Sequence, residues 1–281
     1  MREAPRLLTH FADIAPQYDA LICDIWGVLH NGATAFTAAC DTLKHFRDRH
    51  GRVVLLTNAP RPAKDLEDQF RRFGVPLDCF DTIVTSGEAA REDLARRSTS
   101  ARLAVLHLGP ERDRNVFEGL NVELTEQARA ELVLCTGLYD DDRETPEDYT
   151  GMLAELRQRG LVMLCANPDL VVQRGGQLVY CAGALAQAYE MVGGSVVYYG
   201  KPYRPIYDAA LAALEGASRT LAIGDGLHTD IRGANGVGID ALFIADGIHG
   251  EDVAEFTVRH IAELLAETGV HAVAAMRALV W

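Results

Sequence analysis

Short apolar runs alternate with amphipathic stretches along most of this chain. The runs at residues 20–24, 52–57 and 220–224 are rich in aliphatic residues and show no alternation of apolar and polar positions. Between such runs, apolar residues recur at helical spacing, as in residues 66–73, which Gly74 follows. Strands that are apolar on both faces are typical of parallel sheets covered by helices. The pattern therefore predicts an α/β fold with a parallel-sheet core.

A second set of strand-like runs occupies the middle of the chain, with helical patterns between them. The start of one helix is well marked, because Thr145 can cap it, Pro146 suits the first helical position and Asp148 can complete a capping box. The middle block is long enough to be a domain of its own. We predict a core domain in two parts, residues 1–85 and 196–281, with an α/β domain at residues 86–195 inserted between them.

Composition and charge are those of an ordinary globular protein. The 281 residues are 48% hydrophobic and 24% charged, with a net charge of −13. This balance argues against non-specific nucleic-acid binding, which needs a positive field.

No apolar run approaches the ~20 residues of a membrane span. The first residues lack the apolar core of a secretory signal, so the cytoplasm is the expected compartment.

The six cysteines are widely spaced and form no C-x-x-C pair. Neither a zinc motif nor a redox motif is therefore indicated. Several of the cysteines lie inside apolar runs, and free cysteine behaves as a small buried hydrophobe. We expect all six to be buried and apolar in role.

The residues that end the predicted core strands carry the candidate chemistry. They are Asp24, Thr57, Asn58, Lys201, Asp225 and Asp230. Each alone is more often a turn, cap or surface residue, but a parallel sheet brings the carboxyl ends of its strands to one edge. Close carboxylates repel one another and need a cation, and oxygen ligands that share a phosphate suit Mg²⁺. A carboxylate nucleophile beside Mg²⁺ and a lysine points to phosphoryl transfer through an aspartyl phosphate.

Four short motifs resemble, in the same order, those of the haloacid dehalogenase-like hydrolases: DIWG at 24–27, LLTN at 55–58, GKP at 200–202 and IGDGLHTD at 223–230. The inserted block resembles the cap of subfamily IIA, which includes sugar-phosphate, nucleotide and pyridoxal-phosphate phosphatases, through ANPD at 166–169 and CAGALAQAYE at 181–190. The resemblance implies a Rossmann-like core with an inserted α/β cap, Mg²⁺ as cofactor and a small phosphorylated metabolite as substrate. Caps of this kind often pair into dimers in relatives, so a homodimer is one oligomeric state compatible with the resemblance.

The resemblance assigns roles to the core residues by position. Asp24 is the expected phosphoryl-accepting nucleophile. Mg²⁺ is held by the carboxylates of Asp24 and Asp225 and by the backbone carbonyl of Trp26. Lys201 bridges the nucleophile and the phosphate, and Asp230 lies behind the metal ligands.

The remaining candidates are expected to contact the substrate. Thr57 and Asn58 would bind the oxygens of the transferring phosphoryl group with backbone and side-chain donors. Asn167 and Asp169, in the ANPD motif, would either contact the substrate from the cap or serve as capping and turn residues.

Trp26 departs from the family pattern, which places an acid two residues after the nucleophile. That acid protonates the leaving oxygen and then activates water, whereas tryptophan offers only an N–H donor. The loss of one such proton shuttle costs ~10²–10⁴ in rate, while metal ligation by the backbone carbonyl survives. The indole is expected either to stack on a ring of the substrate or to pack against the protein.

Three interpretations of the tryptophan at position 26 are open. In the favoured one, the protein is a phosphatase for leaving groups that need little protonation, or it uses His30 or His228 as the acid. In the second, it binds a phosphorylated ligand without useful turnover. In the third, it carries out metal-free dehalogenase chemistry; the retained Asp225 argues against this, because clustered carboxylates without a metal are electrostatically costly.

Overall fold

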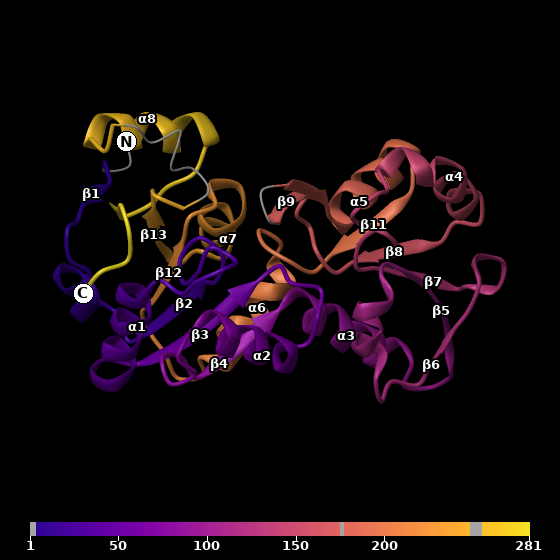
Figure 1. The fold of residues 1–281 in the computed structure, drawn as a ribbon, viewed down its shortest axis with the longest axis horizontal. Coiled ribbons are helices and arrows are strands. Elements are labelled where there is room, and N and C mark those ends of the chain that lie inside the picture. The colour runs from indigo at the N-terminus through magenta and orange to yellow at the C-terminus, as the bar shows by residue number, and fades with distance from the viewer. Residues whose placement is uncertain (1–3, 175–176, 248–254) are drawn as a thin grey trace. The chain divides into compact units, whose positions relative to one another are not determined.

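The computed structural model describes residues 4–174, 177–247 and 255–281, and the chain divides into two compact units. Unit 1 consists of Met1–Thr57, Lys64–Val84 and Lys201–Trp281, and unit 2 consists of Asn58–Ala63 and Thr85–Gly200. Each unit has its own main sheet (Figure 1). Each also has its own hydrophobic core.

Unit 1 is built on a seven-stranded sheet with the order β1-β14-β13-β12-β2-β3-β4. In that order the strands are Arg6–Leu7, Ala274–Met276, Asp240–Ile244, Thr220–Gly224, Ala20–Asp24, Arg52–Thr57 and Thr82–Thr85. The pairings from β1 across to β3 are all parallel. The segments nearest the two ends of the chain, indigo and yellow in Figure 1, thus lie side by side as β1 and β14.

The helices of unit 1 cover the strands that the sequence predicts to be buried. They are α1 (Thr37–Arg49), α2 (Ala63–Phe73), α6 (Arg204–Ala213), α7 (Arg232–Val237) and α8 (Val258–Thr268), with short helices η1 (Phe11–Asp13), η2 (Ala15–Gln17) and η6 (Leu227–Ile231). Every residue of β2 is buried. Ile206 and Tyr207 of α6 pack on Ile22 and Val54, while Ile261 of α8 packs in the cluster that includes β12 and β13.

Unit 2 contains a five-stranded parallel sheet with the order β11-β8-β7-β5-β6. In that order the strands are Ser195–Tyr198, Val162–Cys165, Leu132–Cys135, Leu103–Leu108 and Val122–Leu124. A separate antiparallel pair joins β9 (Val171–Arg174) to β10 (Gln177–Tyr180). The helices are α3 (Ser86–Arg97), α4 (Thr150–Gln158) and α5 (Ala182–Met191), with short helices η3 (Glu111–Phe117), η4 (Gln127–Arg129) and η5 (Pro146–Tyr149).

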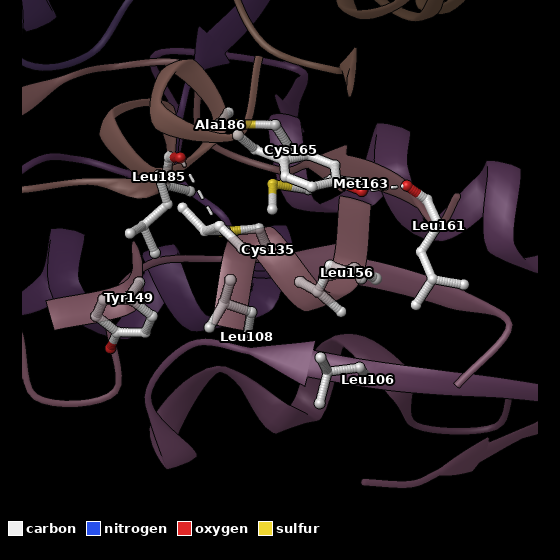
Figure 2. Close-up of a cluster of buried hydrophobic side chains, with 14 of the residues drawn as sticks. Leu106, Leu108, Cys135, Tyr149, Leu156, Leu161, Met163, Cys165, Leu185 and Ala186 are labelled. Carbon is white, nitrogen blue, oxygen red and sulfur yellow. Dashed lines mark hydrogen bonds between the residues drawn. The ribbon is translucent and has the colours of Figure 1, made fainter. Parts of the chain in front are cut away.

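One core cluster of unit 2 lies between its sheet and helices α4 and α5 (Figure 2). Met163 and Cys165 of β8 meet Leu156 of α4 and Leu185 of α5 there. The prediction for the cysteines is confirmed, since all six are free and buried.

The predicted α/β fold with a parallel-sheet core is confirmed. The predicted capping box is present, because Oδ2 of Asp148 accepts a hydrogen bond from the backbone N–H of Thr145 at 2.8 Å. One of the helical patterns predicted in the middle of the chain, near residues 112–118, forms the 3₁₀ helix η3 rather than an α-helix. Within the described ranges, no helix is both long enough and apolar enough to cross a bilayer.

Candidate active site

The carboxyl ends of β2 and β12 bring three aspartates together in unit 1. Asp24 is the last residue of β2, and Asp225 directly follows β12. The two strands are parallel neighbours in which Cys23 pairs with Ile223, so both carboxylates lie at one edge of the sheet. Asp230 comes from η6, the π-helical turn that follows. One carboxylate oxygen from each aspartate lies within 4.8 Å of the others.

Lys201 supplies the positive charge of this cluster. Its Nζ donates to Oδ1 of Asp24 at 2.5 Å and to Oδ1 of Asp230 at 2.8 Å. Burial alone would lower the pKa of the Lys201 ammonium, but the negative charges of Asp230 and Asp24 outweigh burial and raise it well above its usual value. Lys201 therefore stays protonated at this site.

The charges of the cluster fit a divalent cation. The three aspartates and Lys201 are between 2% and 7% exposed, so solvent screens them little. Three carboxylates and one ammonium leave two negative charges without a counter-charge inside the cluster. Burial and the neighbouring Asp24 carboxylate raise the pKa of Asp230, and Lys201 partly offsets this rise. A donor set of carboxylate oxygens with a deficit of two positive charges suits Mg²⁺.

Two glycines leave the space that the Asp225 carboxylate occupies. A Cβ atom placed on Gly27 would lie 2.0 Å from Oδ2 of Asp225, and one placed on Gly247 would lie 2.0 Å from the same oxygen. Gly27 also has a φ of +85°, which a residue with a Cβ adopts at a cost. The backbone at both positions therefore fixes where Asp225 can point. This role of Gly27 was not predicted from the sequence, although Gly27 lies in the DIWG motif.

Asp230 is held on both of its oxygens. Oδ1 accepts from Lys201, and Oδ2 accepts from the backbone N–H of Gly226 and from Oγ1 of Thr229, each at 3.1 Å. The Tyr207 hydroxyl donates to the backbone carbonyl of Asp230 at 3.1 Å. Asp230 thus anchors the turn that carries Asp225 and orients Lys201.

Trp26 lies two residues beyond Asp24 and is half-buried. It forms an isolated β-bridge with His30, in which the N–H of Gly27 donates to the carbonyl of His30 at 2.8 Å. A Cβ atom on Gly32 would lie 3.3 Å from Nε1 of Trp26, so the N–H edge of the indole lies near that glycine.

The two histidines considered as substitute acids differ in their surroundings. His30 is buried, its ring packs edge-on against Phe73, and its Nδ1 accepts from the N–H of Gly32 at 3.0 Å. Burial lowers the pKa of His30 to about 4, so its ring is neutral at neutral pH. His228 is exposed, and Arg232 lies within hydrogen-bond distance of its Nδ1 at 3.3 Å. A buried neutral imidazole that packs on phenylalanine fits a structural role.

The other predicted residues fall into two groups. Thr57 is the last residue of β3 in unit 1 and is half-buried. The side chains of Asn58, Asn167 and Asp169 belong to unit 2. Nδ2 of Asn58 donates to Oδ1 of Asp169 at 2.8 Å, and Oδ1 of Asn167 accepts from the backbone N–H of Asp169 at 3.0 Å. The side chain of Asn167 thus makes the turn contact that was one of its two expected roles.

Comparison with known proteins gives consistent matches. The family described as haloacid dehalogenase-like hydrolase matches residues 21–123, and the family described as HAD-hydrolase-like matches residues 198–268. A crystal structure of a hydrolase of the haloacid dehalogenase-like family from Brucella suis 1330 is 42% identical, covers 98% of this chain and 100% of its own, and superposes with a TM-score of 0.85.

Two more distant relatives have assigned activities. The ribonucleotide monophosphatase NagD of Escherichia coli K12 is 27% identical over 235 residues, which are 83% of this chain and 89% of NagD. A glycerol phosphate phosphatase of Mycobacterium tuberculosis, in complex with magnesium, shares the fold with a TM-score of 0.68 at 24% identity, over 90% of this chain and 79% of its own.

Proposed function

The chain belongs to the haloacid dehalogenase-like hydrolase family, and on that premise we propose that it is a Mg²⁺-dependent phosphatase for a small phosphorylated metabolite. The observation that carries the proposal is the cluster of three buried carboxylates in unit 1, two of which, Asp24 and Asp230, accept hydrogen bonds from Lys201. The activities of NagD and of the glycerol phosphate phosphatase support the reaction class.

The metal would be held by the carboxylates of Asp24 and Asp225 and by the backbone carbonyl of Trp26. When bound, Mg²⁺ supplies the two positive charges that the carboxylates and an incoming phosphate need. Lys201 is already in place beside Asp24 as a fixed cation, and Asp230 holds its ammonium. Such positioning before the substrate arrives is the main source of catalysis in phosphoryl transfer.

The reaction proceeds in two steps. A carboxylate oxygen of Asp24 attacks phosphorus, the bond from phosphorus to the leaving oxygen breaks, and an aspartyl phosphate forms. Water then attacks that phosphorus and releases orthophosphate and free Asp24. Thr57 and Asn58 donate to the phosphoryl oxygens in both steps, and Lys201 offsets their charge.

Trp26 limits the choice of leaving group. Without an acid two residues after the nucleophile, the leaving oxygen receives no proton from that position, so esters of acidic alcohols and acyl phosphates are favoured. The inserted part of the chain, predicted at residues 86–195 between the core parts 1–85 and 196–281, acts as a cap that selects the leaving group.

Hydrolysis assays with and without Mg²⁺ test the proposal. We expect p-nitrophenyl phosphate and acetyl phosphate to be hydrolysed faster than an alkyl phosphate such as glycerol phosphate, and EDTA to abolish all three activities. Asp24→Asn removes the nucleophile and should reduce each rate to background. The exposed Asp208, which pairs only with its helix neighbour Arg204 among the ion pairs of the described residues, provides a control in Asp208→Asn.

The missing acid favours one alternative, a protein that binds a phosphorylated ligand without useful turnover. Calorimetric titration with orthophosphate in the presence of Mg²⁺ separates the two. Binding without hydrolysis of any of the three esters would replace the phosphatase with the binding protein. Hydrolysis that persists in EDTA would contradict the role of the metal.

A further inference from the structure

The segment Asn58–Ala63 belongs to unit 2 although it directly follows β3 of unit 1. The backbone N–H of Gly87 donates to the carbonyl of Ala59 at 3.1 Å, and the N–H of Ala63 donates to Glu88 at 3.0 Å. Arg61 forms an ion pair with the buried Asp113 at 3.6 Å. Asn58 is thus fixed to the inserted unit, whereas its neighbour Thr57 is fixed to the core sheet.

Both ends of the side-chain amide of Asn58 have neighbours that fix its position. Nδ2 donates to Oδ1 of Asp169 at 2.8 Å. On the other side, a Cβ atom placed on Gly200 would lie 2.5 Å from Oδ1 of Asn58 and 2.3 Å from the Pro168 ring. Asn58 is only 6% exposed. Its amide is therefore clamped between the ANPD turn and the glycine that precedes Lys201.

The ANPD turn is itself held in shape. Oδ1 of Asn167 accepts from the backbone N–H of Asp169 at 3.0 Å, and Gly183 lies so close that a Cβ there would be 2.1 Å from the carbonyl of Pro168. The Asp169 carboxylate is thus presented by a rigid turn. A hydrogen bond to a charged acceptor is stronger than one between neutral groups, so it fixes the rotamer of Asn58 firmly.

We infer that Asp169 is a positioning residue that orients Asn58 toward the phosphoryl group and is not itself a substrate contact. This inference rests on the proposed function, in which Asn58 binds the phosphoryl oxygens. A carboxylate that touched the phosphate directly would repel it, whereas one that holds the amide of Asn58 prepares a donor before the ligand arrives. Within unit 2, the ANPD turn therefore holds Asn58, the last residue of the LLTN motif.

A double-mutant cycle tests the inference with orthophosphate as the ligand. In the full-length protein with Mg²⁺, Asp169→Ala should weaken orthophosphate binding about tenfold, in line with the loss of one hydrogen bond to a charged group. Asp169→Asn keeps an oxygen acceptor for Asn58 and should stay within about threefold of wild type. In the Asn58→Ala background, Asp169→Ala should cause no further loss, because its effect passes through Asn58.

Kinetics give a second readout. A positioning residue should lower kcat/KM by the same factor for p-nitrophenyl phosphate, acetyl phosphate and glycerol phosphate, since all three share the phosphoryl group. A loss confined to one ester with unchanged orthophosphate affinity would make Asp169 a contact to the leaving group and overturn the inference. Independent, additive losses in the cycle would overturn it as well.

Two further controls keep the outcomes apart. Asp169→Ser serves if Asp169→Ala does not fold, because its oxygen lies one bond closer to the backbone and no longer reaches Asn58; weaker orthophosphate binding supports the inference, and wild-type affinity contradicts it. A wild-type protein that neither binds orthophosphate nor hydrolyses any ester would overturn the proposed function, and this role of Asp169 with it. An unchanged affinity of Asp169→Ala in a protein whose wild type binds orthophosphate would overturn the positioning role alone.

Discussion

Lys201 donates from Nζ to Oδ1 of Asp24 across 2.5 Å, and both side chains are buried. The two residues are 177 positions apart, and they join the end of β2 to the point at which the chain returns to unit 1. The same ammonium also donates to Asp230 and offsets its negative charge. Asp225 adds a third carboxylate, with an oxygen within 4.8 Å of the other two. Lys201 therefore sets the charge balance of the site, together with the divalent cation proposed to bind the carboxylates.

Replacing Lys201 with methionine should destabilise the metal-free protein. Removal of one partner from a buried ion pair leaves an uncompensated charge and costs about 3–5 kcal/mol. Added Mg²⁺ should raise the stability of Lys201→Met more than that of wild type, because the metal then replaces the missing charge. Urea unfolding in EDTA and in Mg²⁺ measures both effects. As a control, Lys44→Met removes an exposed ion pair with Asp78 and should change the free energy of unfolding by less than about 1 kcal/mol. Equal changes in the two variants would contradict the role of Lys201 as the counter-charge of buried carboxylates.

Gly27→Ala should weaken Mg²⁺ binding because the new Cβ would fall 2.0 Å from Oδ2 of Asp225. Gly74 offers a matched control, since its φ of +83° is close to the +85° of Gly27 while a Cβ there meets nothing within 4 Å. Both variants should lose about 1–2 kcal/mol through the left-handed backbone. Only Gly27→Ala should weaken Mg²⁺ affinity, by about tenfold or more, as measured by calorimetry. Equal Mg²⁺ affinities in the two variants would show that Gly27 does not shape the site.

Trp26→Asp should accelerate the hydrolysis of alkyl phosphates by restoring a proton donor for the leaving oxygen. The expected gain is about 10²–10⁴ for glycerol phosphate, with little change for p-nitrophenyl phosphate, whose leaving group needs no proton. Asparagine has nearly the same shape as aspartate but no titratable group. Trp26→Asn therefore separates proton transfer from the simple removal of the indole. Comparable gains in both variants would mean that Trp26 acts by bulk and not by the absence of an acid.

His30 should make the protein less stable in mild acid. Burial lowers its pKa from 6.5 to about 4, so between these values the unfolded chain binds a proton that the folded protein does not. The free energy of unfolding therefore falls as the pH decreases from about 6.5 to about 4, by at most about 1.4 kcal/mol per pH unit for this group. His30→Asn keeps an acceptor for the N–H of Gly32 and removes the titrating group. The free energy of unfolding, measured with urea, should therefore fall less in this variant as the pH decreases.

A second buried histidine provides an internal check on that slope. Burial and the charge of Arg114 lower the pKa of His107 in unit 2 to about 4. The free energy of unfolding of the double variant His30→Asn/His107→Asn should therefore change less with pH than that of His30→Asn alone. An unchanged slope in both variants would place the acid sensitivity elsewhere, and a large loss of hydrolysis in His30→Asn would point to an acid–base role for His30.

The run before Lys201 was predicted as a core strand, but it is β11 of the unit 2 sheet, so the position of Lys201 did not follow from the strand pattern. The parallel core and the meeting of Asp24 with Asp225 could be predicted from the sequence for one physical reason. Strands buried on both faces read as uninterrupted apolar runs, and the ends of such strands meet at one edge of a parallel sheet. The type of element and its last residue were therefore visible in the sequence. The chemical roles of these residues remain predictions until the variants above are measured.

What the sequence did not reveal depends on short elements and on contacts between distant residues. Strands β1, β6 and β14 have two or three residues each, too few to show a period of two. The hydrogen bond from Asn58 to Asp169 joins residues 111 positions apart, and no local pattern encodes it. The fit of Asp225 against Gly27 is a matter of packing, which one sequence without its coordinates does not display.

The pairing of β2 with β12 has a consequence for synthesis of the protein. β2 ends at Asp24 and β12 begins at Thr220, so ribosomes must translate all of unit 2 before these strands can pair. The strands of the unit 2 sheet lie between Leu103 and Tyr198, and domains fold as units as they emerge. The nascent chain therefore completes the inserted unit first, and the strand that bears Asp24 keeps one edge open until translation is nearly finished.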